Sequence, residues 1–237
     1  MNLDARAYVG GELALFERAR NWKAYLARQL GSSITGEVAE VGAGIGATTR
    51  ALCSQSVTRW TCLEPDPDMA EGLRQSIALG ELPPNCEVIS GGLGGIPGHR
   101  RFGAILYVDV LEHIADDRAE LAAAGELLAR GGRLIVIAPA HQWLFGPFDR
   151  AIGHYRRYSL ADLAALTPPN LSLIKARYLD SVGMIASAAN TLVLRSAMPN
   201  LGQILTWDRV MVPVSRLLDP LIGYRLGKTA LAIWRHT

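Results

Sequence analysis

The stretch at residues 38–46 reads Val38-Ala39-Glu40-Val41-Gly42-Ala43-Gly44-Ile45-Gly46. Its apolar first half and its three alternating glycines predict a β-strand that ends in a tight turn, followed by a helix over residues 47–54. Glycine has no Cβ, so the backbone of such a turn can approach a ligand closely, and the N–H groups at the start of the helix face the same point. The stretch therefore predicts a site for a nucleotide-like ligand at the carboxyl end of the first strand.

Strand-like and helix-like segments alternate along the rest of the chain. We expect strands over residues 37–41, 59–63, 86–90, 103–108, 133–138, 171–179 and 229–234. The run at residues 134–138 is apolar at every position, which is typical of a parallel strand covered on both faces. The alternation predicts an α/β fold with a doubly wound sheet.

The 237 residues fit a single domain. We divide it into an N-terminal helical cap (1–31), a ligand-binding core (35–140), a substrate loop (139–158) and a helical insertion before the last strand (181–225). The substrate loop is rich in aromatic residues, glycine, histidine and arginine. Because it follows the fifth strand, we expect it to cover the carboxyl ends of the strands.

Composition narrows the class of protein. The 24 basic and 22 acidic residues leave a net charge of +2, which gives no reason to expect a nucleic-acid partner. The three cysteines, Cys53, Cys62 and Cys86, form no CxxC pair, so we expect reduced thiols. The first residues lack the apolar core of a signal peptide, and no uncharged apolar run reaches about 18 residues. We therefore expect a cytoplasmic protein.

Glu40 separates two classes of cofactor. An acid two residues before the first glycine is expected beside the ligand, where it would repel the pyrophosphate of a dinucleotide. It suits the cationic amino-acid end of S-adenosylmethionine (SAM). The alternative is a dinucleotide-binding dehydrogenase, because Gly42, Gly44 and Ala47 fit its relaxed fingerprint and Glu64 fits its ribose acid.

Four motifs in order resemble the class I SAM-dependent methyltransferases, mainly over residues 35–140. They are the glycine turn at 40–46, the acidic strand end at 61–66 (TCLEPD), the segment at 109–113 (DVLEH) and the turn at 128–134 (LARGGRL). The resemblance implies a Rossmann-like, seven-stranded and mostly parallel sheet, in which residues 229–234 supply a final antiparallel strand.

The resemblance also implies the cofactor site. The residues expected to bind SAM, or its product S-adenosylhomocysteine, are Glu40, Gly42, Ala43, Gly44, Gly46, Thr48, Glu64, Pro65, Gly92, Leu93, Val108 and Asp109. The two oxygens of Glu64 match a pair of vicinal ribose hydroxyls. Many members place an acid near the adenine amino group, but the loop at 90–95 has none, so we expect backbone and apolar contacts there.

Methyl transfer leaves the protein to position the acceptor and to remove its proton. The candidates for proton removal are His154, His113, His141 and Tyr155, with His154 and His113 preferred. Trp143 and Phe148 are expected over the acceptor, and Arg156 and Arg157 against an anionic group on it. The segment at 153–159 distantly resembles ubiquinone-pathway small-molecule O-methyltransferases; the alternative is a solvated basic turn.

A divalent metal is not expected. Some O-methyltransferases, of the ubiquinone pathway or acting on small RNA, bind one with an acid-x-x-Glu-His motif and a later histidine. The corresponding residues here would be Asp109, Glu112 and His113 with His154 or His141. The short side chain of Asp109 and the incomplete ligand set favour a metal-free site in which Glu112 and His113 only shape the loop.

The sequence thus predicts methyl transfer from SAM to a small or medium-sized acceptor, with oxygen as the first choice of atom. Transfer to nitrogen or carbon of a small metabolite or lipid-linked acceptor is an alternative, as is a non-catalytic SAM-fold interaction protein. An apolar stripe at 201–222 must be buried somewhere: against its own domain, in a homodimer, or on a membrane surface. Its polar positions mix Asp208 and Asp219 with Arg209 and Arg216, which argues against a membrane.

Overall fold

The computed structural model describes residues 13–190 and 198–237, and it contains one seven-stranded sheet with the order β3-β2-β1-β4-β5-β7-β6. The strands are β1 (Gly36–Val41), β2 (Val57–Glu64), β3 (Cys86–Ser90), β4 (Phe102–Val108), β5 (Leu128–Pro139), β6 (Leu171–Leu179) and β7 (Thr229–His236). All pairings are parallel except those of β7, which runs antiparallel to both β5 and β6. The predicted α/β class and the antiparallel last strand are confirmed.

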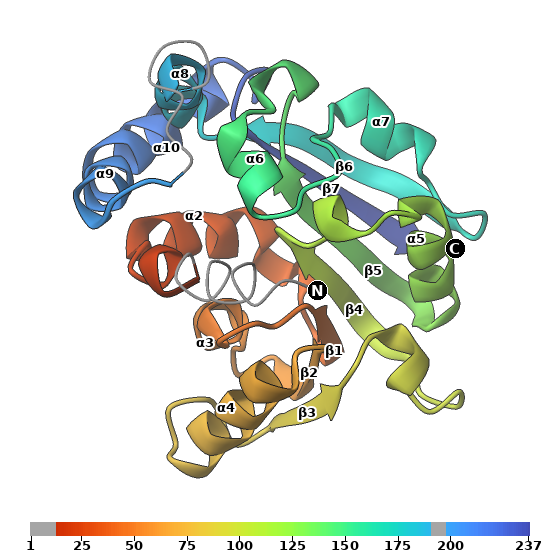
Figure 1. The fold of residues 1–237 in the computed structure, drawn as a ribbon. Coiled ribbons are helices and arrows are strands. Elements are labelled where there is room, and N and C mark those ends of the chain that lie inside the picture. The colour runs from red at the N-terminus through yellow and green to blue at the C-terminus, as the bar shows by residue number, and fades with distance from the viewer. Residues whose placement is uncertain (1–12, 191–197) are drawn as a thin grey trace.

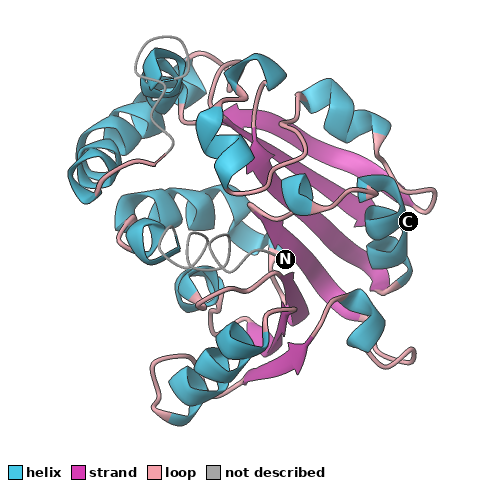
Figure 2. Ribbon diagram, viewed as in Figure 1, coloured by secondary structure: helices cyan, strands magenta, loops and turns pink. Residues whose placement is uncertain are grey.

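Helices cover both faces of this sheet (Figures 1 and 2). They are α2 (Arg20–Leu30), α3 (Ala47–Leu52), α4 (Pro67–Ala78), α5 (Asp117–Glu126), α6 (Pro147–Ala151), α7 (Leu160–Ala165), α8 (Ser181–Ala189), α9 (Leu201–Thr206) and α10 (Val212–Leu221). Successive side chains of β5 point to opposite faces: Ile135 joins the core under α2 and α4, and Leu134 joins the core under α5 and α7. The central run of β5, residues 134–138, is buried on both faces and is apolar at every position, as the sequence predicts for such a strand.

The described part of the N-terminal helical cap, expected over residues 1–31, is not one continuous helix. Residues 11–12, like the rest of 1–12, lie outside the described residues; residues 13–17 are helical, and a break at Arg18 and Ala19 precedes α2. Both oxygens of Asp208 cap the new helix, accepting from the N–H groups of Asn21 (3.2 Å) and Trp22 (2.9 Å). A carboxylate at a helix N-terminus satisfies free donors and complements the helix dipole.

Two further buried aspartates fix the helical insertion to the end of β6 and to α2. It comprises α8, α9, a π-helical turn (Trp207–Met211) and α10; residues 191–197 lie outside the described part. Asp180 accepts hydrogen bonds from Trp207 Nε1 (2.6 Å) and Ser215 Oγ (2.7 Å), and Asp219 accepts one from the hydroxyl of Tyr25 (2.7 Å). Across the residues that the structure describes, no helix has the length and apolar character needed to cross a bilayer.

The sheet order places a site at one edge. In the sheet, β2 and β3 lie on one side of β1, and β4 and β5 lie on its other side. The loops after β1 and β4 therefore diverge from a switch point, which is where ligands bind in open α/β sheets.

Candidate active site

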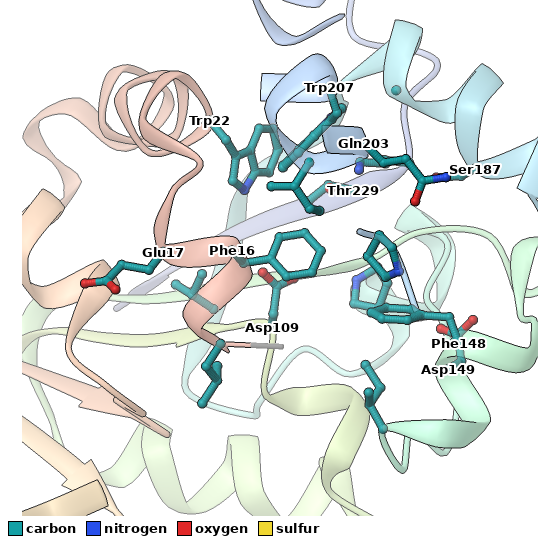
Figure 3. A pocket seen from close by; sticks show the side chains of 18 of the residues that line it. Phe16, Glu17, Trp22, Asp109, Phe148, Asp149, Ser187, Gln203, Trp207 and Thr229 are labelled. Atoms are coloured by element: carbon teal, nitrogen blue, oxygen red, sulfur yellow. The ribbon is translucent and has the colours of Figure 1, made fainter. Parts of the chain in front are cut away.

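A cavity of about 810 Å³ opens at the carboxyl ends of β1, β4 and β5. Its walls come from the glycine turn, the loop after β4, the substrate loop, α2, α8 and α9. Figure 3 shows the aromatic rings of Phe16, Trp22, Phe148 and Trp207 around this space, with Asp109 on its floor. A volume of this size accommodates a cofactor together with a small molecule.

The glycine turn forms one end of the cavity. Gly42, Ala43, Gly44 and Thr48 line it, as the motif predicts, whereas Gly46 packs away from it. Gly44 has a φ of 56°, and a Cβ built there would reach the cavity-lining Leu13 at 3.4 Å. The left-handed backbone and the missing Cβ at Gly44 leave room for a ligand in this turn, and this space fits the amino-acid half of SAM.

Glu40 does not lie beside this ligand space, contrary to expectation. Its carboxylate is buried behind the turn, where Oε2 accepts from Thr49 Oγ1 (2.5 Å) and Trp60 Nε1 (2.9 Å). Burial raises the pKa of Glu40 to about 7 in spite of these two donors. The physical reason is strand alternation, because residue 40 of β1 points into a helix-covered face and not along the sheet edge.

The predicted adenosine end lies at the ends of β2 and β3. Glu64 ends β2, where its oxygens accept from the N–H groups of Gly44 (2.7 Å) and Asp66 (2.9 Å). Burial raises the pKa of Glu64. Pro65, Gly92 and Leu93 follow β2 and β3, and none of them lines the cavity. Their contacts with a nucleoside stay a prediction.

His154 is the best-positioned candidate base. Its Nδ1 lies 2.8 Å from Asp149 Oδ1, and both side chains line the cavity. Asp149 is buried and accepts two further bonds from Arg157 (2.7 and 2.9 Å) and one from the N–H of Gly146. These partners overcome burial and lower the pKa of Asp149 to about 2, so that it remains a carboxylate. Arg157 also lines the cavity, but its guanidinium group is hydrogen-bonded to Asp149.

Glu112 and His113 stand next to His154. Glu112 is fully buried, and neither of its carboxylate oxygens has a hydrogen-bond partner among the described residues. Burial and the negative charge of Asp109 raise its pKa well above the usual range. The His113 ring lies edge-on to the His154 ring, at 4.6 Å between centres. Desolvation and the neighbouring His154 lower the pKa of His113 to about 4, so that its imidazole is neutral at pH 7.

Three of the five residues considered for a metal come together. One ligand atom each from Glu112, His113 and His154 lies within 4.8 Å of the others. Asp149 holds the far nitrogen of His154, as acids commonly do behind metal-bound histidines. In ligand type and spacing the set fits a divalent cation with open positions. Asp109 lines the same cavity, in the left-handed backbone region that aspartate tolerates (φ 53°).

Several predicted site residues lie elsewhere. His141 packs its ring against Tyr178, at 4.5 Å between centres, and does not line the cavity. Tyr155 is 59% exposed, and Trp143 is 56% exposed. Arg156 turns outward to Asp117 (2.7 Å) and the carbonyl of Ala115 (2.8 Å). Of the predicted loop residues, only Phe148, His154 and Arg157 line the cavity.

Sequence reasoning missed Lys228, which precedes β7 and lines the cavity. Its Nζ lies 3.9 Å from the centre of the Trp207 ring and 3.6 Å from Asp180 Oδ2. Burial lowers the pKa of Lys228, although Asp180 and Asp109 oppose the shift. The ammonium therefore lies in the cavity wall between the Trp207 ring and the Asp180 carboxylate, which also accepts from Trp207, Ser215 and the backbone of Gly183.

Known proteins resemble this chain in sequence and in fold. The profile of a methyltransferase-domain family matches residues 39–134. A demethylmenaquinone methyltransferase of Tropheryma whipplei (strain Twist) is 32% identical over 177 residues, which cover 70% of this chain and 67% of the relative.

Two solved structures show the same fold. One is a chain in the complex between the Haloferax volcanii Trm112 methyltransferase activator and a methyltransferase, with a TM-score of 0.66, 15% identity, and coverage of 100% of this chain and 98% of that chain. The other is coclaurine N-methyltransferase bound to N-methylheliamine and S-adenosylhomocysteine, with a TM-score of 0.61, 13% identity, and coverage of 90% and 72%.

Proposed function

Because the chain belongs to the class I SAM-dependent methyltransferases, we propose that it methylates an oxygen of a small or medium-sized acceptor and that His154 removes the acceptor's proton. The observation that carries the proposal is the Asp149–His154 pair in the cavity wall, on the acceptor side of the glycine turn. The relative is named for demethylmenaquinone, which supports a small-molecule acceptor here too.

The chain's own residues account for binding and proton removal. Gly42, Gly44 and Thr48 offer the turn for SAM, which supplies an electrophilic methyl group when bound. The Asp149 carboxylate accepts the Nδ1 proton of His154 and so favours the tautomer with a free Nε2 lone pair. Nε2 lies 3.6 Å from Glu112 Oε1, beyond hydrogen-bond distance, and remains available to an acceptor hydroxyl.

Binding of SAM is the first test. We expect wild type to bind SAM and S-adenosylhomocysteine in titration calorimetry and Gly44→Val to bind them at least about tenfold more weakly. Valine at a φ of 56° is strained, and its branches would fill the space that the turn leaves for the ligand. Gly80→Val is the matched control, because Gly80 has a φ of 74° in an exposed turn with open space around it. A wild type that binds neither compound would contradict the proposal.

Lys228 supports an acceptor with an acidic oxygen, such as a phenol or a carboxylate. In a panel of phenolic, carboxylic and amine acceptors, we expect turnover with the oxygen acceptors. We expect Lys228→Met to lower their kcat/KM about 10–100-fold through the loss of a charge-assisted hydrogen bond. Lys175→Met is the control, because Lys175 lies on β6 outside the cavity. Turnover with amines alone would show nitrogen transfer instead.

A metal-assisted reaction is a second candidate, favoured by the unpaired oxygens of Glu112 beside His113 and His154. A divalent cation there would lower the pKa of an acceptor hydroxyl. Without a cation, burial and the charge of Asp109 raise the pKa of Glu112, and a protonated carboxyl can itself donate to the acceptor. Turnover that survives dialysis against EDTA supports the histidine alone; loss that Mn²⁺ restores supports the metal.

A further inference from the structure

The helical insertion presents an apolar stripe to solvent. Apart from Ile185 of α8, the exposed apolar residues of its described part are Leu201, Val210, Val214, Leu217, Leu218 and Leu221, and we call these six the outer face. From Val210 onward they recur every three or four positions along the π-helical turn and α10, so they share one side of the helix. The opposite side is buried through Trp207, Val212 and Ser215. Figure 1 shows α8, α9 and α10 standing beside the sheet as a separate layer.

The exposed charges of the described residues 198–225, which carry the outer face, have one sign. Asp208 and Asp219, the two acids of this helical run, are buried and committed to backbone and side-chain donors. Arg209 and Arg225 are exposed, and Arg216 is half-buried. The mixture of charges seen in the sequence is therefore absent at the surface. Because both acids are buried, the mixed signs in the sequence give no argument against membrane contact at this surface.

We propose that the outer face binds the surface of a bilayer that contains anionic lipids. Exposed leucines beside arginines are the two components of an interfacial helix, because the apolar side chains enter the acyl boundary and the guanidinium groups contact headgroup phosphates. The proposal goes beyond methyl transfer and does not depend on it.

A second copy of the chain fits the outer face less well. A twofold interface would set this surface against itself and bring the arginines of two copies together. Within residues 198–225 no exposed acid compensates them, because Asp208 and Asp219 are buried. The positive charge beside the outer face thus favours an anionic lipid surface over a homodimer.

The position of the outer face relates it to the active site. Gly202, Gln203 and Thr206 of α9 line the cavity, and so do Ala186 and Ser187 of α8. Figure 3 places Gln203 and Ser187 at the cavity on the side of these helices. An acceptor with an apolar tail could therefore remain in the bilayer while its polar end occupies the cavity.

Vesicle sedimentation with the full chain, without SAM, tests the proposal. We expect binding to vesicles of phosphatidylcholine mixed with phosphatidylglycerol, little binding to phosphatidylcholine alone, and weaker binding at high salt. Leu217→Ser/Leu221→Ser, at side chains 72% and 81% exposed, should lower vesicle affinity about tenfold or more without unfolding the protein. Arg209→Ser/Arg225→Ser should remove the preference for the anionic vesicles.

Matched controls are Leu79→Ser, at a side chain 74% exposed at the end of α4, and Arg130→Ser, at the amino end of β5. Both should bind vesicles like wild type. The proposal is overturned if wild type does not bind the vesicles that contain phosphatidylglycerol, or if it binds vesicles with and without this lipid equally. It is also overturned if the leucine variants bind vesicles with the affinity of wild type. A dimer in ultracentrifugation that the leucine variants dissociate would overturn it in favour of a second copy. SAM calorimetry on the same samples reports separately on the proposed function.

Discussion

Replacing His154 with alanine will lower turnover about 10²–10⁴-fold and leave the dissociation constant for SAM within about threefold of wild type. The loss is confined to turnover because His154 stands on the acceptor side of the cavity, whereas the glycine turn forms the other end. The measurement is release of S-adenosylhomocysteine at saturating acceptor, paired with calorimetry of SAM binding.

The same substitution should leave the fold intact. Asp149 keeps its two bonds from Arg157 and the N–H of Gly146 when the imidazole is removed. His154→Gln should be equally inactive, since an amide can donate to Asp149 but cannot take a proton. His99→Ala, in an exposed loop, is the control that should keep full turnover. Full turnover by His154→Ala with unchanged SAM binding would eliminate the histidine as base and leave only binding and orientation to the protein.

The cofactor end of the site was predictable because its information is local. The glycine turn, the strand before it and the helix after it occupy one continuous stretch, and Gly42 and Gly44 line the cavity as their spacing predicts. The α/β class followed from the alternation of strands and helices, because an apolar run such as residues 134–138 needs cover on both faces. Glu40 was misplaced because the motif fixes its position along the chain but not which face of β1 it points to.

The acceptor end was predictable only in part because it is assembled from distant segments. His154 was found from its position in the substrate loop, but Arg156 and Arg157 could not be told apart until the loop showed that the first turns outward to Asp117. Lys228 gave no signal, since a lone lysine before a strand has no motif. Its role depends on Trp207 and Asp180, which lie 21 and 48 positions away in the sequence. Those contacts are tertiary and leave no periodic pattern.

Replacing Glu40 with glutamine will remove a pH dependence of stability worth about 3 kcal/mol. Burial holds the pKa of Glu40 at about 7 in the folded state against 4.5 as its ordinary value. Between these values the folded protein binds more protons than the unfolded chain, so the free energy of unfolding falls as pH rises. The contribution is fully present below pH 4.5 and is lost by the time pH passes 7. Glutamine does not ionise, so its curve lacks this fall.

Urea unfolding of both proteins across pH 4.5 to 8 measures the effect, read as the difference between the two curves, since other acids titrate in both. Glu71→Gln, at a side chain 58% exposed on α4, is the control and should parallel wild type. Parallel curves for Glu40→Gln would mean that the carboxylate is ionised in the folded state throughout this range. In that case Thr49 and Trp60 would outweigh burial, and a charged Glu40 behind the glycine turn could act on a cationic ligand through the field of that charge, without lining the cavity.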